Sequence, residues 1–108
     1  ETLFVSGTAS VEGSQVIHIG DVEAQAKLSL KNVSRVLAQR NMGLEHLFLA
    51  RAYVARPVHY TDSDFEKAVL LSHDVVREIL PVTPCLFIQA NVCRPEWLFE
   101  IEGIAGRR

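Results

Sequence analysis

Two carboxylates inside an otherwise apolar segment constrain the fold of this chain most. Residues 98–105 read Leu-Phe-Glu-Ile-Glu-Gly-Ile-Ala. Because the side chains of a β-strand alternate between its two faces, Glu100 and Glu102 should share one face. Leu98 and Ile104 should lie beside them, and the opposite face should carry Phe99, Ile101, Gly103 and Ala105. A carboxylate on a sheet face meets water, meets a partner charge, or lies in a pocket that shifts its pKa.

The preceding segment is predicted to be a strand as well. Residues 85–92 are mostly apolar and lead through a short connection, residues 93–97, into residues 98–105. The end of the chain is therefore interpreted as a pair of strands joined by a turn. Earlier strands are predicted over residues 3–6, 16–19 and 47–54.

Two segments have the three-and-four spacing of an amphipathic helix. The first follows Asp21, a suitable N-cap, and is expected to end at Asn41 and Gly43. The second follows two overlapping capping boxes, one formed by Thr61 with Asp64 and the other by Ser63 with Glu66.

The resulting order, β-β-α-β-α-β-β, predicts an α+β fold in which two helices pack on one face of a mixed sheet of about four strands. The strand over residues 47–54 is apolar on both faces, which is typical of a strand that is covered on both sides. Because two helices cover only one face of such a sheet, we expect another subunit or another domain to bury the other face.

Bulk properties exclude some classes of protein. The chain has 108 residues, enough for one domain over residues 1–108; it starts at Glu1, and we expect a fragment that lacks an upstream strand or an N-terminal domain. The net charge of −2 argues against a general nucleic-acid binder, and no apolar run approaches the roughly 18 residues of a membrane span. Cys85 and Cys93 lie at the start and just past the end of one predicted strand, too far apart for a disulfide, which favours reduced thiols and a cytoplasmic protein.

Several motifs together resemble the RidA (YjgF) family, whose members are trimeric α+β domains with a chorismate-mutase-like fold. The resemblance covers nearly the whole chain and is carried by Phe4-Val5-Ser6-Gly7, Gly20-Asp21-Val22-Glu23-Ala24-Gln25, Leu30-Lys31-Asn32-Val33, Tyr53-Val54, Asp64-Phe65 and Phe99-Glu100-Ile101-Glu102-Gly103-Ile104-Ala105. It implies a homotrimer, or a pseudo-oligomer with a sister RidA-like domain, that binds a small carboxylated metabolite without a cofactor. The family's opening strand and an aromatic pocket residue have no counterpart here.

One position departs from the RidA pattern. In the imine deaminases of this family an arginine at the start of the penultimate strand holds the substrate carboxylate, and counting back from the Glu-Ile-Glu motif places that position at Cys85. A guanidinium binds a carboxylate through two parallel hydrogen bonds, which a thiol cannot do. Imine deamination is therefore the alternative rather than the leading interpretation, although Glu100 matches the family's water-orienting glutamate.

One subgroup of the RidA family matches the motifs of this sequence better than the imine deaminases do. Val5-Ser6-Gly7-Thr8-Ala9-Ser10, His18-Ile19-Gly20-Asp21 and Val92-Cys93-Arg94-Pro95-Glu96 resemble the C-terminal half of chorismatases. These enzymes cleave the enolpyruvyl group from chorismate and have an additional N-terminal domain. The resemblance implies that Glu100 acts as the acid, that Cys93 lines the pocket, and that pyruvate is released together with a hydroxybenzoate-type or dihydrohydroxybenzoate-type product.

The residues themselves leave alternatives open for the two carboxylates. Glu100 is either a general acid whose pKa is raised by apolar neighbours (Leu98, Ile104 and Phe87), or an edge carboxylate paired with Arg51 or with a lysine of a neighbouring strand. Glu102 is more often a structural partner, for instance of Arg51 or of a neighbouring chain. Two adjacent carboxylates repel, which raises one pKa or demands a cation between them.

Other candidate site residues are less specific. Ser6, Gly7 and Thr8 offer backbone N–H groups and hydroxyls that suit an anion, or form a turn without a ligand. The remaining candidates for substrate binding are Cys85, Phe87, Gln89, Cys93 and Arg94. The two thiols are otherwise small buried hydrophobes, Arg94 is otherwise solvated, and Phe87 and Gln89 belong either to a pocket wall or to a subunit interface. No spacing suits a metal site, and a non-catalytic binding module remains the third interpretation.

Overall fold

The structure is a computed structural model that describes residues 1–9, 11–12, 15–16, 21–89 and 97–107. Its main sheet consists of β1 (Thr2–Ala9), β4 (Leu47–Val54), β5 (Cys85–Gln89) and β6 (Phe99–Gly106), in the spatial order β1-β6-β4-β5. A separate pair of short strands is formed by β2 (Val11–Glu12) and β3 (Gln15–Val16). The predicted α+β fold with a four-stranded mixed sheet is confirmed; of the strand expected over residues 16–19, only Val16 is described.

The last two strands are consecutive in the chain but are not neighbours in the sheet. β4 lies between them, parallel to β5 and antiparallel to β6. The predicted pairing of the two strands is therefore wrong. The reason is the helix that connects β4 to β5, because a strand-helix-strand crossover places its two strands side by side and parallel. The final strand then pairs on the free side of β4.

Both helices begin at the predicted caps. α1 (Val22–Ala38) starts where Asp21 Oδ1 accepts the N–H of Ala24 at 3.0 Å. α2 (Asp62–Ile79) starts with a reciprocal capping box, in which Thr61 Oγ1 accepts the N–H of Asp64 and the Asp64 carboxylate accepts the N–H of Thr61, both at 3.0 Å. Asn41 has a φ of 57° just after α1, which matches its predicted role in ending the helix.

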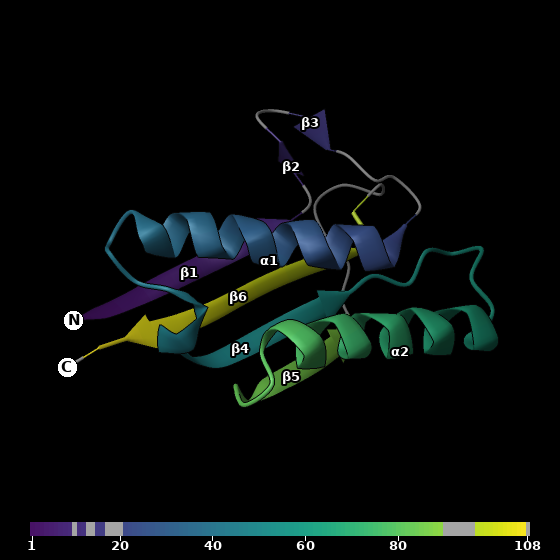
Figure 1. The fold of residues 1–108 in the computed structure, drawn as a ribbon. Helices are drawn as coiled ribbons and strands as arrows, with labels where there is room; N and C mark the ends of the chain where they lie inside the picture. The colour runs from purple at the N-terminus through teal and green to yellow at the C-terminus, as the bar shows by residue number, and fades with distance from the viewer. Residues whose placement is uncertain (10, 13–14, 17–20, 90–96, 108) are drawn as a thin grey trace.

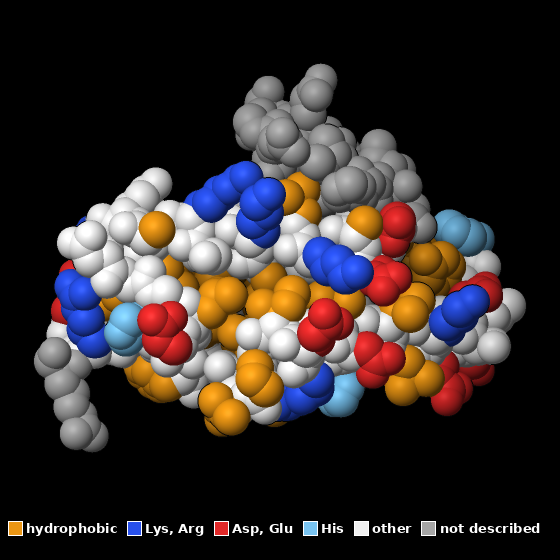
Figure 2. Space-filling view, in the orientation of Figure 1, with side chains coloured by type: hydrophobic (Ala, Val, Ile, Leu, Met, Phe, Trp, Pro, Cys, Tyr) orange, Lys and Arg blue, Asp and Glu red, His pale blue; other side chains and the backbone are white. Residues whose placement is uncertain are grey.

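The two helices cover one face of the sheet (Figure 1). α1 packs over β1 and β6, and α2 packs over β4. The core between the layers contains Val5, Leu30, Val33, Leu37, Ala50, Ala52, Val54, Val76, Phe99, Ile101 and Ala105, all nearly or fully buried. Figure 2 shows hydrophobic side chains over the middle of this helix-covered side, with charges of both signs distributed around them. Within the described residues, no helix has the length and apolar character needed to cross a membrane.

The other face of the sheet has no helix over it and is called the open face below. It carries Phe4, Leu49, Arg51, Tyr53, Leu86, Ile88, Glu100, Glu102 and Ile104. Phe4 is 55% exposed and Leu86 61% exposed. Large apolar side chains at this exposure on one contiguous sheet surface are typical of an interaction site.

Candidate functional site

The alternation predicted for the last strand is confirmed. In β6, residues Phe99, Ile101, Gly103 and Ala105 are buried toward the helices, and Glu100, Glu102 and Ile104 are partly buried on the open face. Leu98 differs from the prediction, because it precedes β6 and belongs to the buried core. Both carboxylates therefore lie near the middle of the sheet, on the face that the helices leave uncovered.

Glu102 is held by two side chains of the neighbouring strand β4. Its Oε1 atom lies 2.6 Å from Nη2 of Arg51 and also accepts a hydrogen bond from the hydroxyl of Tyr53. Arg51 is its direct neighbour across the ladder, so the expected ion pair with Arg51 is confirmed. The Glu102 side chain is only 16% exposed. An arginine and a hydroxyl donor therefore both satisfy this mostly buried carboxylate.

The hydrogen bond from Tyr53 was not foreseen from the sequence. Residues Leu49, Arg51 and Tyr53 share one face of β4, so the alternation alone places this hydroxyl within reach of the two glutamates. The hydrogen bond to Glu102 raises the pKa of Tyr53, and burial adds to the effect. Tyr53 therefore stays protonated and remains a donor at neutral pH.

Glu100 lies one step along β6, opposite Tyr53 in the β4 ladder and opposite Ala9 in the β1 ladder. Burial raises the pKa of its carboxyl group, and the nearby charge of Glu102 raises it further. This is the direction expected for a general acid, but the predicted neighbours are partly wrong. Leu98 lies in the core, and the ring of Phe87 packs 5.4 Å from the ring of His73 on the helix side.

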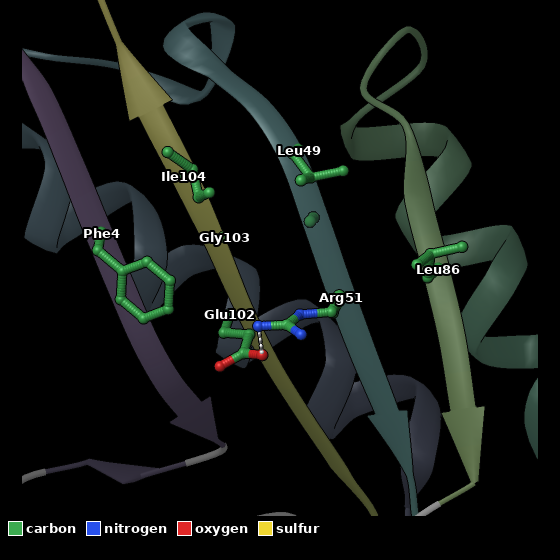
Figure 3. Close-up of a pocket in the computed structure, with 8 residues that line it drawn as sticks. Phe4, Leu49, Arg51, Leu86, Glu102, Gly103 and Ile104 are labelled. Carbon is green, nitrogen blue, oxygen red and sulfur yellow. Dashed lines mark ion pairs between the residues drawn. The ribbon is translucent and has the colours of Figure 1, made fainter.

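A shallow hollow of about 210 Å³ lies on the open face beside Glu102. It is lined by Phe4, Leu49, Ala50, Arg51, Leu86, Glu102, Gly103 and Ile104. Figure 3 shows Phe4 on β1, Glu102 and Ile104 on β6, Leu49 and Arg51 on β4, and Leu86 on β5, with the Arg51–Glu102 ion pair among apolar side chains. Such a surface can accept an apolar group together with one polar contact. Glu100 does not line the hollow and lies two residues before Glu102 on the same face of β6.

The segment Ser6-Gly7-Thr8 is part of a strand rather than a turn at its end. Val5 pairs with Gly103 and Thr8 pairs with Ile101, so β1 contains one more residue than β6 between these pairs. An extra residue of this kind forms a β-bulge, which leaves backbone groups out of the ladder. The prediction of a turn is corrected accordingly, and the predicted anion contact remains untested.

The candidates on β5 do not lie beside the two glutamates. Cys85, Phe87 and Gln89 pair with Ala50, Ala52 and Val54, whose side chains face the helices. Within this chain, the sheet therefore separates these three residues from Glu100. Their role as substrate contacts is untested.

Burial raises the pKa of the Cys85 thiol, which favours the neutral thiol over the nucleophilic thiolate. Cys93 and Arg94 lie outside the described residues. Among the residues that are described, no group of three or more histidine, cysteine, aspartate or glutamate side chains is placed to hold a metal ion.

Comparison with known proteins gives relatives of two kinds. The chain is 34% identical to a 3-hydroxybenzoate synthase of Streptomyces hygroscopicus, over 94% of this chain and 30% of that protein. It is 29% identical to a chorismatase of Streptomyces rapamycinicus, over 94% of this chain and 31% of that protein. The chain thus spans about a third of the length of these curated relatives.

Solved structures agree with the fold. A chorismatase crystal structure superposes with a TM-score of 0.74 at 22% identity, covering 97% of this chain and 32% of the other. A member of the YjgF protein family from Neisseria meningitidis superposes with a TM-score of 0.75 at 22% identity, covering 99% of this chain and 80% of the other. At these identities the superpositions establish the fold.

The family model described as Endoribonuclease L-PSP matches residues 1–106, almost the whole chain. The motifs, the sheet order with its two helices, and this match agree with one another. The chain belongs to the Endoribonuclease L-PSP family, the RidA/YjgF family whose motifs it carries.

Proposed function

We propose that this chain is the RidA-like domain of a chorismatase-like enzyme and that Glu100 is its general acid. The observation that carries the proposal is a partly buried carboxyl group on the open face whose pKa is raised by burial and by the adjacent Glu102, which pairs with Arg51. A raised pKa favours the protonated carboxylic acid, which is the form that protonates an enol ether. The relatives named chorismatase and 3-hydroxybenzoate synthase support this choice of substrate.

The proposed step transfers the Glu100 proton to the methylene carbon of the enolpyruvyl group. The neighbouring carbon becomes an oxocarbenium ion, water adds to it, and one proton of that water returns to Glu100. The resulting hemiketal breaks its bond to the ring oxygen, which releases pyruvate and leaves a hydroxyl group on the ring. Because chorismate already carries one ring hydroxyl, the ring product is then a dihydro-dihydroxybenzoate-type acid, or a hydroxybenzoate if the ring also loses water.

The open face supports a second part of the proposal. Covering Phe4 and Leu86 removes exposed apolar surface from water, which favours association. We propose that two further copies of the chain, or a sister RidA-like domain, cover this face and complete the pocket. Cys93, Arg94 and the segment from Ser6 to Thr8 are proposed to contact the substrate there.

The test is release of pyruvate from chorismate by the purified complete protein, followed by coupled oxidation of NADH by lactate dehydrogenase. Glu100→Gln keeps the size and hydrogen-bonding ability of the side chain but removes the acid, so we expect kcat to fall by about 10²–10⁴-fold. Glu45→Gln is the matched control, because the Glu45 side chain is 75% exposed and lies outside the site. Turnover by Glu100→Gln at the wild-type rate would eliminate the assignment.

Imine deamination is the second candidate, because the family match and Glu100 are common to both proposals. Cys85 weakens it, since this half-buried thiol replaces a carboxylate-binding arginine and faces the helices. Ammonia release from an imine derived from an amino acid, measured with the same protein, separates the two activities. If neither reaction proceeds, a non-catalytic module that binds a small metabolite is the remaining proposal.

A further inference from the structure

Helix α1 carries two polar residues on its buried side, Gln25 and Ser29, and both are 0% exposed. They are one helical turn apart, so they lie on the same stripe of the helix. Buried polar side chains are normally hydrogen-bonded, because an unsatisfied polar group in the core is costly. Gln25 follows this rule because its side chain accepts a hydrogen bond. The Ser29 hydroxyl has no hydrogen-bond partner in the part of the chain that the structure describes.

The carbonyl oxygen Oε1 of Gln25 accepts the backbone N–H of Leu98 at 2.8 Å. The carbonyl of Leu98 in turn accepts the N–H of Ala55 at 3.0 Å, directly after β4. Leu98 is buried and immediately precedes β6. Its peptide groups are therefore held on one side by the end of β4 and on the other by a side chain of α1.

This contact fixes the point at which the last strand enters the sheet. Glu100 is the second residue of β6 and follows Leu98 by two positions. A displacement of Leu98 would therefore displace Glu100 as well. From this geometry we infer that Gln25 is a positioning residue for Glu100: it anchors Leu98 and so keeps the Glu100 carboxyl group in its partly buried place on the open face. The inference deepens the proposed function and rests on it for its catalytic consequence.

The consequence has a definite direction. If the anchor is lost, the first residues of β6 can separate from the sheet, and water reaches Glu100. Burial is the main cause that raises the pKa of this carboxyl, so its pKa should then move down toward that of an ordinary glutamate. A general acid works in its protonated form, so activity falls as pH rises through its pKa. Loss of the anchor should therefore shift the alkaline limb of the kcat profile to lower pH.

The experiment compares three variants. Gln25→Leu removes the acceptor at similar volume, Gln25→Glu keeps a carboxyl oxygen at the same reach, and Ser29→Ala is the control. The Ser29 hydroxyl has no hydrogen-bond partner among the described residues, so its removal perturbs the same buried stripe without touching the anchor. The primary readouts are an NMR titration of the Glu100 carboxyl carbon and the hydrogen exchange of the Leu98 amide. The pH profile of kcat for chorismate cleavage is the secondary readout.

We expect Gln25→Leu to speed exchange at Leu98, lower the pKa of Glu100, and reduce kcat at least ~10-fold with a smaller change in KM. Gln25→Glu should restore most of these properties, and Ser29→Ala should match the wild type. If Gln25→Leu does not fold, Gln25→Asn, whose shorter side chain cannot reach Leu98, takes its place. Unchanged titration of Glu100 in the folded variant would overturn the inference, leaving Gln25 with a merely structural role.

The two proposals fail in different ways. If the wild type does not release pyruvate from chorismate, the proposed function fails, but the titration and the amide exchange still test whether Gln25 positions Glu100. If the wild type is active and Gln25→Leu titrates and turns over like Ser29→Ala, the positioning inference alone fails.

Discussion

Replacing Leu86 by lysine tests whether the open face is buried in the assembled protein. Leu86 is 61% exposed in the isolated chain and lies beside Arg51 in the β5–β4 ladder. Full burial of a leucine side chain contributes about 1.5–3 kcal/mol, so covering the exposed share contributes roughly 1–2 kcal/mol per copy. Leu86→Lys loses this hydrophobic contribution and adds charge repulsion between the new lysine and Arg51.

In a trimer three copies lose this contribution at once. The sum is roughly 3–5 kcal/mol, which corresponds to a weakening of the assembly constant by about 10²–10⁴-fold. The assay is sedimentation or light scattering over a series of protein concentrations, together with the free energy of unfolding from urea titration. If copies cover the face, the mass falls; if a sister domain covers it, the free energy of unfolding falls instead.

Leu70→Lys is the matched control. Leu70 is 57% exposed, almost as much as Leu86, but it lies on α2 and not on the open face. A lysine there follows Glu66 by four residues, a favourable spacing on a helix, so neither mass nor stability should fall. If Leu86→Lys and Leu70→Lys have the same mass and the same free energy of unfolding as the wild type, the argument that the open face is buried is refuted.

Two further predictions concern charge. Glu102→Gln removes the charge that adds to the raised pKa of Glu100. NMR titration should therefore show a lower pKa of Glu100, still raised by burial, and the alkaline limb of the rate profile should move to lower pH. An unchanged titration of Glu100 would contradict the electrostatic effect of Glu102. Thr61→Ala removes the N-cap of α2 and should cost about 1 kcal/mol in urea unfolding. Hydrogen bonds from the backbone and hydroxyl of Thr61 lower the pKa of Asp64. This contribution to stability is present above the unfolded pKa of Asp64 and is lost as pH falls through its folded pKa. The difference between wild type and Thr61→Ala should therefore narrow in acid, while the part that comes from the Asp64 N–H bond to Thr61 Oγ1 remains.

Most of the fold could be predicted because it is encoded locally. The caps at Asp21 and Thr61, the spacing within the helices, and the alternation around Glu100 and Glu102 all depend on residues within a few positions of each other. The order of the strands depends on partners far apart in the chain, and a turn between two strands does not fix their pairing. The crossover through α2 places β5 beside β4 and parallel to it, so β5 does not pair with β6 as predicted.

The site was predicted in part for the same reason. In residues 85–89, Cys-Leu-Phe-Ile-Gln, apolar side chains occupy both faces, so the sequence could not tell which face would meet the helices. The register with β4 placed Phe87 on the helix side. The anchor from Gln25 to Leu98 joins residues 73 apart in sequence, and no local pattern signals such a contact.

The two carboxylates of β6 have different environments, and the difference comes from β4. Arg51 and Tyr53 both bind Glu102, so this mostly buried carboxylate has two donors from the neighbouring strand. The pKa of Glu100 is raised by burial and by the charge of Glu102, and both effects favour its protonated form. If Arg51 paired with Glu100 instead, that carboxyl would be ionised and could not donate a proton. The placement of one arginine and one tyrosine, two residues apart on β4, therefore determines which glutamate can serve as an acid.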